Sequence, residues 1–434
     1  MPDRPAPALS VLFLAGEYPP APGGVGDYTA LLARHLAQQG VRVTVLASRL
    51  AGAAPEAEPA PGVRVWRWVS RWDWRCGRLV AAAVRAAQPA LVHLQYQPAA
   101  FGLEAAVCWL PGWLRRRCPS VRTVVTFHDL RVPYLFPKAG RLRAAARDRL
   151  LRGADAAVFT EPADWAAAAA IRPAGRYWIP IGSNLAVAPP PGYDRRAWRR
   201  AAGADDTTFL VVHLGFLNPS KGLETLFDAL VRLHTQGRRV RLLLVGAEAG
   251  TTNAANRAYA RALARRLAAP PLDGLVQRRP VLPPAEASGY LLAADAAAFP
   301  FTDGASLRRG SLLAALAHGL PCVSTRPAAG ARPAGAPPRL GAFDPVRLAL
   351  RDGETLLLVP PGDSGALAAA LARLMDDAAL RARLAAGGRA LTAQLSWPRI
   401  AAAQRALYAA LLGAPASRPC VGDGTEPADT AEHR

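Results

Sequence analysis

The sequence has few cysteines and no long apolar run, and each of these two shortages excludes a class of protein. Its five cysteines are odd in number, and none stands in a Cys-x-x-Cys pair. A disulfide framework and a zinc ribbon are therefore disfavoured, and we expect a reduced, cytoplasmic protein without a metal site. No run approaches the ~18 apolar residues that span a bilayer. No basic segment precedes the short apolar stretch 8–15, so we expect no secretory signal.

Acidic residues are also scarce beside basic ones. The 434 residues include 53 Lys+Arg and 32 Asp+Glu, which gives a formal net charge of +21. Such a charge fits a phosphate-rich substrate, an anionic membrane surface or nucleic acid. A genome rich in G and C would favour Ala and Arg over Lys and produce the same charge without a functional cause, so the charge alone selects no partner.

The only two lysines are Lys138 and Lys221, and the second stands in a pattern typical of an anion site. The apolar run 209–214 predicts a buried strand that Gly215 ends, and a polar turn leads through Lys221 into a helix. The free N–H groups and dipole of a helix N-terminus favour a phosphate, and a lysine adds a full charge. The plainer alternative is an exposed loop lysine without a role, because this pattern is common.

The first strand–helix–strand unit has a glycine-rich crossing. The pattern predicts a strand at 8–15, a helix at 28–39 and a second strand at 41–47. Gly23 and Gly24, in the loop before the helix, let a phosphate or sugar approach the backbone closely. Their spacing is not the dinucleotide Gly-x-Gly-x-x-Gly, so nicotinamide binding is not supported. A merely flexible loop is the alternative.

The alternation of strands and helices continues in two halves of similar length. A proline-rich, charged stretch at 186–208 predicts the linker between them. We therefore expect an α/β fold of two doubly wound domains facing across a cleft. The expected divisions are 1–190, 191–395, a closing helix at 396–412 and a disordered tail at 413–434. The remaining expected strands are 91–97, 123–127, 156–160, 177–181, 240–246, 275–281, 296–301, 321–325 and 356–359.

Tryptophan and arginine interleave in two segments, 63–87 and 100–118. The tryptophans there are Trp66, Trp68, Trp72, Trp74, Trp109 and Trp113. This combination suits a lipid headgroup interface or stacking on nucleic-acid bases. The alternative is a strand and a helix whose tryptophans belong to the core and whose arginines are solvated.

A histidine follows the expected strand 123–127. At the carboxyl end of a parallel strand, His128 and Asp129 point into the crevice where open α/β sheets bind ligands. A single histidine at such a place is structural as often as it is functional, so both roles stay open.

Taken together, these motifs resemble the GT-B glycosyltransferases, and in particular glycosyltransferase family 4, over residues 8–412. The Pro-Pro-x-x-Gly-Gly-Val-Gly-x-Tyr loop is similar to the family's loop near the donor phosphates. His128 matches its active-site histidine, and Gly215 with Lys221 matches the loop whose lysine holds the diphosphate.

Two further segments extend the resemblance to the end of the chain. Residues 314–321 match the helix and turn before the next strand of the second domain, and 396–397 begin a helix like the one that crosses back to the first domain. The resemblance implies an N-terminal acceptor-side domain and a C-terminal nucleotide-sugar donor domain.

The chain departs from the family at two motifs. Phe216 stands where the family has an arginine, and a Glu-x7-Glu motif that binds the donor sugar is missing. Counting back from the turn after the helix places the two acidic positions at Ser306 and Ala314. Counting forward from the end of the preceding strand places them at Asp303 and Ser311. The intervening arginines and serines form an anion cradle of their own and replace the lost charge, or else the lost acids indicate a different donor or an inactive enzyme.

The resemblance predicts a retaining glycosyltransferase that moves a sugar from a nucleoside diphosphate to a saccharide or lipid-linked acceptor, of the cell-envelope or exopolysaccharide type. We expect His128, Lys221 and Asp303 to be catalytic. The expected donor-binding residues are Gly23, Gly24, Gly215, Lys221, Ser306, Arg308, Arg309, Gly310 and Ser311. Cations and amides would stabilise the diphosphate leaving group, so no cofactor or metal is expected.

The predicted location is the cytoplasm, at the inner face of the membrane, with peripheral membrane contact and no nucleic-acid partner. Two alternatives stay open. One is a nucleotide-sugar epimerase of the same fold, which needs additional acid/base carboxylates in the cleft. The other is a basic, non-catalytic protein that binds nucleic acid or membrane, favoured by the charge of +21 and by the missing acids.

Overall fold

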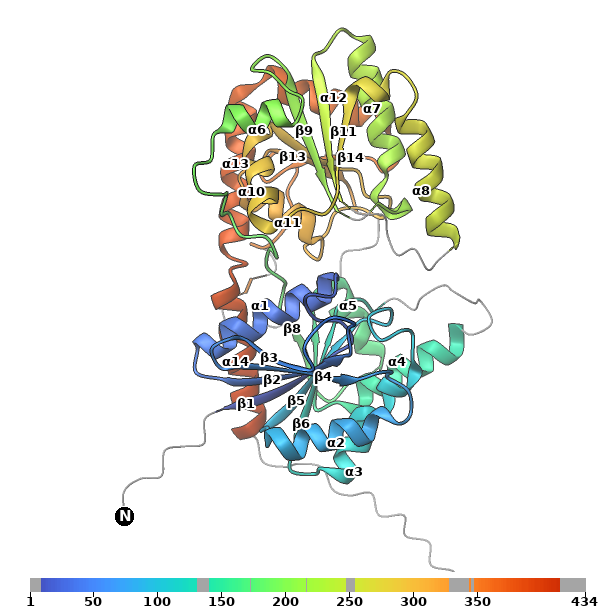
Figure 1. Ribbon diagram of the computed structural model, residues 1–434, viewed down its shortest axis with the longest axis vertical. Coiled ribbons are helices and arrows are strands. Elements are labelled where there is room, and N and C mark those ends of the chain that lie inside the picture. Colours follow the sequence, from blue (N-terminus) through green and yellow to red (C-terminus); the bar gives the residue numbers. More distant parts are fainter. Residues whose placement is uncertain are drawn as a thin grey trace, which may run out of the picture.

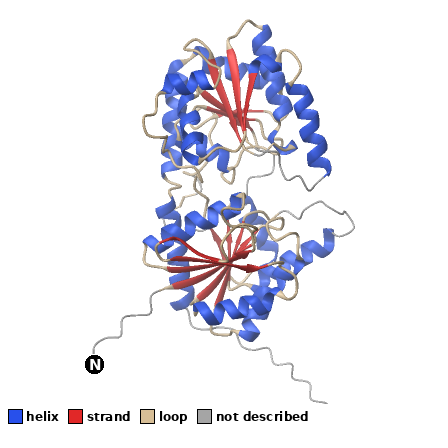
Figure 2. Ribbon diagram, viewed as in Figure 1, coloured by secondary structure: helices blue, strands red, loops and turns tan. Residues whose placement is uncertain are grey.

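The computed structural model describes residues 9–130, 140–171, 173–215, 217–246, 254–327, 343–344 and 347–413. Two α/β domains lie one above the other, each with helices around a central sheet (Figures 1 and 2). This architecture agrees with the two doubly wound domains expected from the sequence. Phe216 and the expected tail beyond Gly413 lie outside the described residues.

The first domain contains an eight-stranded sheet in the order β3-β4-β2-β1-β5-β6-β7-β8. Neighbouring strands are parallel except at the edge, where β3 and β4 are antiparallel. The strands are β1 Ser10–Ala15, β2 Arg42–Ser48, β3 Glu56–Ala60, β4 Val63–Val69, β5 Leu91–Tyr96, β6 Arg122–Phe127, β7 Ala156–Phe159 and β8 Arg176–Trp178. The central strands β1 and β5 are buried along their whole length, as expected for a sheet covered on both faces.

The helices of this domain connect the parallel strands. They are α1 Gly24–Gln38, α2 Cys76–Ala87, η1 Ala105–Trp109, α3 Leu110–Arg117, α4 Gly140–Gly153, α5 Pro162–Ala167 and η3 Ala168–Ile171. Helix α1 begins four residues before its predicted start. Its first turn is stabilised because the Glu17 carboxylate accepts hydrogen bonds from the backbone N–H groups of Val25 and Gly26.

The second domain contains a six-stranded, fully parallel sheet in the order β11-β10-β9-β12-β13-β14. Its strands are β9 Phe209–Leu214, β10 Val240–Val245, β11 Val276–Arg279, β12 Ala296–Phe299, β13 Cys322–Thr325 and β14 Leu357–Val359. Its helices are α6 Arg195–Ala201, η4 Pro219–Lys221, α7 Leu223–Thr235, α8 Ala254–Leu267, α9 Leu272–Leu275, α10 Pro284–Ala293, α11 Gly310–Ala317, α12 Ser364–Asp376 and α13 Ala378–Ala393.

Part of the expected linker is folded onto the second domain. Helix α6 packs against α10, with the ring of Trp198 edge-on to Tyr290 at 4.6 Å. The Arg199 guanidinium is buried and donates to the backbone oxygens of Ala293 and Thr208 and to the carboxylate of Asp295. Helix α6 is therefore held on the second domain by a buried guanidinium and its several acceptors. An apolar side chain, which would have marked the helix in the sequence, does not have this role.

The last helix returns to the first domain. Helix α14, Trp397–Gly413, runs beside α1 although it follows the second domain in sequence (Figure 1). The Trp397 indole N–H donates to the Ser183 backbone oxygen at 2.7 Å, and Tyr408 places its hydroxyl 2.6 Å from Nδ1 of the buried His93. These contacts tie α14 to β5 and to the segment that follows β8.

The tryptophan-rich segments divide between core and surface. Trp66 and Trp72 are buried, so for these two the core alternative holds and the interface interpretation is wrong. Trp74 is 68% exposed, and its ring lies 5.1 Å from that of Trp109. Among the described residues, no helix has the length and hydropathy needed to cross a bilayer.

Replacing Arg199 with Met should lower the free energy of unfolding by about 3 kcal/mol, because it removes one buried charged donor from Asp295 and from several backbone carbonyl groups. Arg195 provides a matched control, since it pairs with the same carboxylate from a side chain that is 49% exposed. Arg195→Met should cost less than ~1 kcal/mol. Urea denaturation followed by circular dichroism measures both, and equal losses would contradict the role given to α6.

Candidate active site

The lysine loop of the second domain places one ammonium group beside a glycine. After β9, the Asn218 side-chain oxygen accepts hydrogen bonds from the N–H and hydroxyl of Ser220, which turns the chain into η4. Gly222 then adopts a positive φ of 63°, where a Cβ would lie 2.0 Å from the Pro300 oxygen. Gly215 has a φ of 141°, and a Cβ there would lie 3.3 Å from Nζ of Lys221. Both glycines are therefore required by the path of the loop.

The ammonium group of Lys221 is surrounded by groups that suit an anion. It lies 5.1 Å from the centre of the Phe301 ring, and the Arg309 guanidinium lies 4.5 Å from the same ring. Burial, with the positive charge of Arg309, lowers the pKa of Lys221 to about 8, against the opposing effect of Asp303. Within the described part of the chain, this ammonium makes no ion pair or hydrogen bond. It is a partly desolvated cation that a phosphate would neutralise.

The start of α11 lies next to this lysine. The Ser311 hydroxyl is buried without a hydrogen-bond partner among the described residues, and it lies 3.8 Å from the position of a Cβ at Gly215. Gly310 begins the helix, so its N-terminus adds a partial positive charge. The structure therefore brings together Gly215, Lys221, Arg309, Gly310 and Ser311, and that they bind the donor stays a prediction.

The two neighbouring arginines point to different partners. Arg309 forms an ion pair with Asp303, the residue expected to contact sugar hydroxyls. Arg308 reaches across to the first domain, where its Nη1 lies 3.5 Å from Asp129 and 3.6 Å from Asp164. Arg309 thus lies near Lys221, whereas Arg308 connects the two domains. The anion site predicted from both arginines therefore contains only Arg309.

Glu161, at the end of β7, was not identified from the sequence. Burial raises the pKa of its carboxyl to about 7, against opposing effects of Arg308, Ser306 and Arg309 from the second domain. This places the predicted residue Ser306 opposite a carboxyl of the facing domain. Ala314, the second position of the missing acid motif by one count, is buried inside α11 and cannot contact a ligand. In the sequence, only the position of Glu161 just after an expected strand could have indicated a role in ligand binding.

His128 stands at the carboxyl end of β6, as predicted. Its Nε2 lies 3.0 Å from the Gln95 side-chain oxygen, and its ring meets Tyr28 edge-on at 4.7 Å. Burial lowers the pKa of His128 to about 3, so the ring is neutral at physiological pH. With Nε2 donating to Gln95, Nδ1 is an acceptor, and the residue is suited to hydrogen bonding rather than to proton transfer.

The glycine-rich loop of the first domain already holds a carboxylate. A Cβ on Gly23 would lie 2.1 Å from an oxygen of Glu17, which occupies the N–H groups of Val25 and Gly26. Gly24 has open space at its Cβ, and its backbone oxygen accepts a hydrogen bond from Asn184. A donor phosphate that used these amides would have to displace Glu17, whose pKa is raised by burial.

Family models match both halves of the chain. Residues 23–179 match the glycosyl transferase 4-like domain, and residues 208–377 match the glycosyl transferases group 1 domain. The first match contains the glycine-rich loop and His128, and the second contains Lys221 and α11.

Individual proteins are similar over most of the chain. A D-inositol 3-phosphate glycosyltransferase of Geodermatophilus obscurus is 27% identical over 417 residues, covering 89% of this chain and 85% of that protein. Sucrose-phosphate synthase from Thermosynechococcus elongatus superimposes with a TM-score of 0.71 at 21% identity, covering 93% of this chain and 99% of that one. Anabaena HepE, solved with UDP-glucose, has a TM-score of 0.66 at 18% identity, with coverage of 93% and 99%.

Binding of a nucleoside diphosphate should be accompanied by proton uptake at alkaline pH. The pKa of Lys221 is about 8 in the free protein and rises when an anion approaches, so above pH 8 the neutral amine regains its proton on binding. Isothermal titration at pH 8.5, in buffers of different ionisation enthalpy and with UDP, ADP and GDP in turn, should show uptake of most of one proton.

Two variants of Lys221 distinguish the effect of its positive charge on binding from the effect of its proton uptake. Lys221→Arg should bind without proton uptake, because a guanidinium stays charged. Lys221→Met should weaken binding on the order of 100-fold, about 3 kcal/mol. Wild-type affinity in the Met variant would refute the assignment of Lys221 to the diphosphate.

Proposed function

Because the chain belongs to the GT-B glycosyltransferases, with a glycosyl transferase 4-like domain followed by a group 1 domain, we propose that it transfers a sugar from a nucleoside-diphosphate sugar with retention of anomeric configuration. The observation that carries this proposal is the partly desolvated ammonium of Lys221, which has no ion pair or hydrogen bond among the described residues and lies beside Arg309 and the N-terminus of α11. These are three positive groups at one place in the cleft.

The chemistry follows from that arrangement. As the glycosidic bond breaks, negative charge grows on the diphosphate, and preformed positive groups stabilise it more in the transition state than in the substrate. Lys221 and Arg309 supply full charges, and the Ser311 hydroxyl supplies a donor. The proposal needs no metal, because cations and amides neutralise the leaving group.

The sugar would lie between the two domains. Neutral His128 offers a hydrogen-bonding nitrogen from the first domain, and Glu161 offers a carboxyl. We propose that Glu161 takes over the contact to sugar hydroxyls that the missing acid motif makes in the family. Asp303, held by Arg309, would orient that arginine toward the phosphates.

The nature of donor and acceptor is also part of the proposal. The solved structure of Anabaena HepE contains UDP-glucose, and the curated relative is named for an inositol phosphate acceptor. We propose a saccharide or lipid-linked acceptor of the cell-envelope or exopolysaccharide type, reached from the cytoplasmic face of a membrane. The exposed Trp74 next to Trp109 and the net charge of +21 support peripheral contact with anionic lipid.

A panel of nucleotide sugars tests the proposed activity. Release of nucleoside diphosphate, detected by ultraviolet absorbance after chromatography, should identify one base and sugar, and Lys221→Met should reduce turnover on the order of 100-fold. The anomeric configuration of the product, read by NMR, should equal that of the donor. Inversion would refute the retaining mechanism, and turnover unaffected by Lys221→Met would refute the proposed site.

Glu161→Gln should change both stability and activity in a pH-dependent manner. Since the pKa of Glu161 is about 7 in the folded protein and 4.5 for an ordinary glutamate, the folded state holds a proton that the unfolded state releases, and the free energy of unfolding falls as pH rises between these values. A glutamine does not ionise, so the variant should not lose stability in this way. Its thermal stability relative to wild type should therefore increase from pH 5 to pH 8. Turnover at pH 8 should fall about 10- to 30-fold, because a hydrogen bond to a charged carboxylate is lost.

The pH–rate profile distinguishes a functional from a structural carboxyl. Wild-type kcat/KM should rise through pH 7 as Glu161 ionises, and the Gln variant should lack this rise. A gain in stability with unchanged activity would mean that Glu161 is only a strained structural residue.

A further inference from the structure

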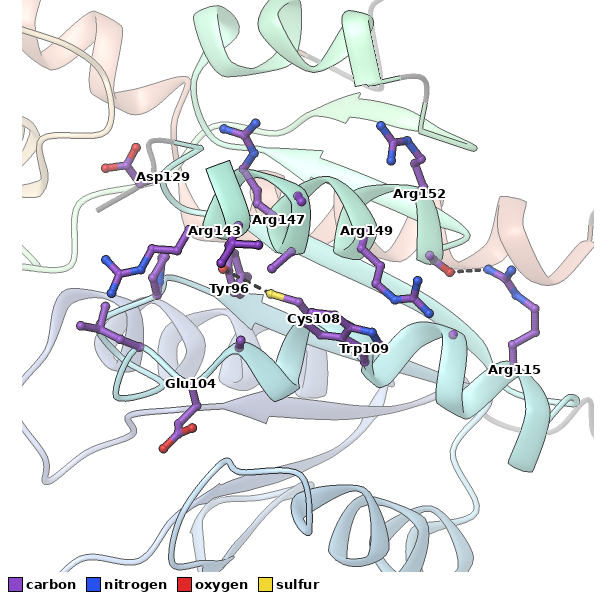
Figure 3. Close-up of a pocket in the computed structure, with 18 of the residues that line it drawn as sticks. Tyr96, Glu104, Cys108, Trp109, Arg115, Asp129, Arg143, Arg147, Arg149 and Arg152 are labelled. Carbon is purple, nitrogen blue, oxygen red and sulfur yellow. Dashed lines mark hydrogen bonds between the residues drawn. The ribbon is translucent and has the colours of Figure 1, made fainter. Parts of the chain in front are cut away.

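A long groove lies in the first domain between α4 and the η1–α3 segment. Its volume is about 750 Å³. At one end it reaches Asp129, which follows His128, and at the other it reaches Arg115 and Arg152 (Figure 3). One end of the groove therefore opens at the proposed catalytic cleft, and the other leads away from it.

The floor of this groove is apolar. Trp109 and Cys108 lie along it, with the Cys108 thiol donating to the Tyr96 hydroxyl (Figure 3). Ala146 of α4 also lines the groove. The exposed hydrophobic side chains of the protein concentrate here. Of the six large ones that are exposed among the described residues, Leu142 and Leu103 line the groove and Trp74 packs on Trp109. Such a cluster at the surface indicates an apolar ligand or partner.

The rim of the groove is basic. Its arginines are Arg115, Arg116, Arg143, Arg147, Arg149 and Arg152, against the two acids Glu104 and Asp129. Arg149 lies 5.4 Å from the Trp109 ring, and Arg115 donates to the Gly153 backbone oxygen. Near the cleft end, Arg147 donates to the Leu130 backbone oxygen and forms an ion pair with Asp148 of the same helix. An apolar floor inside a basic rim is complementary to an amphiphile that carries negative charge.

The length of the groove fits a lipid chain. Its lining along α4 extends from Leu142 to Gly153, and at 1.5 Å per helical residue this spans roughly 17 Å. One leaflet of the bilayer hydrocarbon core is about 15 Å thick. The groove can therefore take the first part of a lipid chain that continues into a membrane.

We propose that this groove binds the lipid end of a lipid phosphate or diphosphate acceptor. The chain lies on the Trp109 floor, and the phosphate is held by arginines at the end near Asp129, so the attached saccharide reaches His128 and the donor. This inference rests on the proposed glycosyl transfer and narrows its acceptor to an anionic lipid. A soluble sugar phosphate would use the arginines but not the apolar floor.

The test compares ligands with and without the apolar chain. Farnesyl diphosphate, inorganic diphosphate and glucose 6-phosphate are titrated calorimetrically into the full chain, saturated with the nucleoside diphosphate that binds best so that the donor site is filled. Farnesyl diphosphate should bind at least about tenfold more tightly than the other two, because only it buries apolar surface. Equal binding of glucose 6-phosphate would overturn the lipid assignment in favour of a soluble acceptor.

A variant that fills the groove tests its location. Ala145 is exposed on α4 and lines the groove, so Ala145→Trp should block it without disturbing the core, and affinity for farnesyl diphosphate should fall at least about tenfold. Ala386→Trp, at an exposed position of α13 in the other domain, is the matched control and should leave it unchanged. Unchanged affinity of Ala145→Trp for farnesyl diphosphate would refute the assignment of the lipid site to this groove.

The same variants separate this inference from the proposed function. Nucleoside diphosphate affinity should be equal in wild type and both tryptophan variants. If farnesyl diphosphate binds as described but no nucleotide sugar is turned over, the groove stands and the proposed transfer fails. If a nucleotide sugar is turned over but the lipid does not bind, the transfer stands and the groove assignment fails.

Discussion

The cleft is organised by one unfavourable interaction, the removal of the Lys221 ammonium from water without an ion pair or hydrogen bond from the described residues. Burial and the nearby guanidinium of Arg309 both disfavour its charge, as the lowered pKa shows. Such a group costs free energy until an anion arrives, so binding of a diphosphate relieves a strain that the fold already bears. The positive φ of Gly215 disfavours any side chain there, and Nζ of Lys221 lies close to the position that a Cβ would take.

The two domains meet through charge at the cleft, and aromatic packing holds the last helix on the first domain. Arg308 faces Asp129 and Asp164 across the gap, close to the raised-pKa carboxyl of Glu161. On the other side, Trp397 packs on Tyr28, which in turn contacts His128. The position of the catalytic-side histidine thus depends on a helix at the end of the chain as well as on its own strand.

Much of the fold could be predicted from the sequence, because buried parallel strands are short apolar runs and their order follows from alternating helices. The lysine loop was equally accessible, since Gly215 and Lys221 are close in sequence. Glu161 was missed because it acts through residues of the other domain that only folding brings near. Glu17 was missed because no sequence pattern marks a carboxylate that accepts from the first turn of a helix eight residues further on. Helix α6 was missed because it is anchored by a buried arginine, and composition alone could not separate Trp66 in the core from Trp74 at the surface.

The return of α14 to the first domain has a consequence for how the protein is made. His93 is fully buried, and the tyrosine hydroxyl beside it belongs to Tyr408. On the ribosome, the second domain is synthesised in full before this helix emerges, which takes on the order of tens of seconds. During that time the first domain has an uncovered face along α1 and an incomplete core. Its final packing is therefore a late step, and a nascent chain truncated before α14 carries a finished second domain beside an unfinished first one.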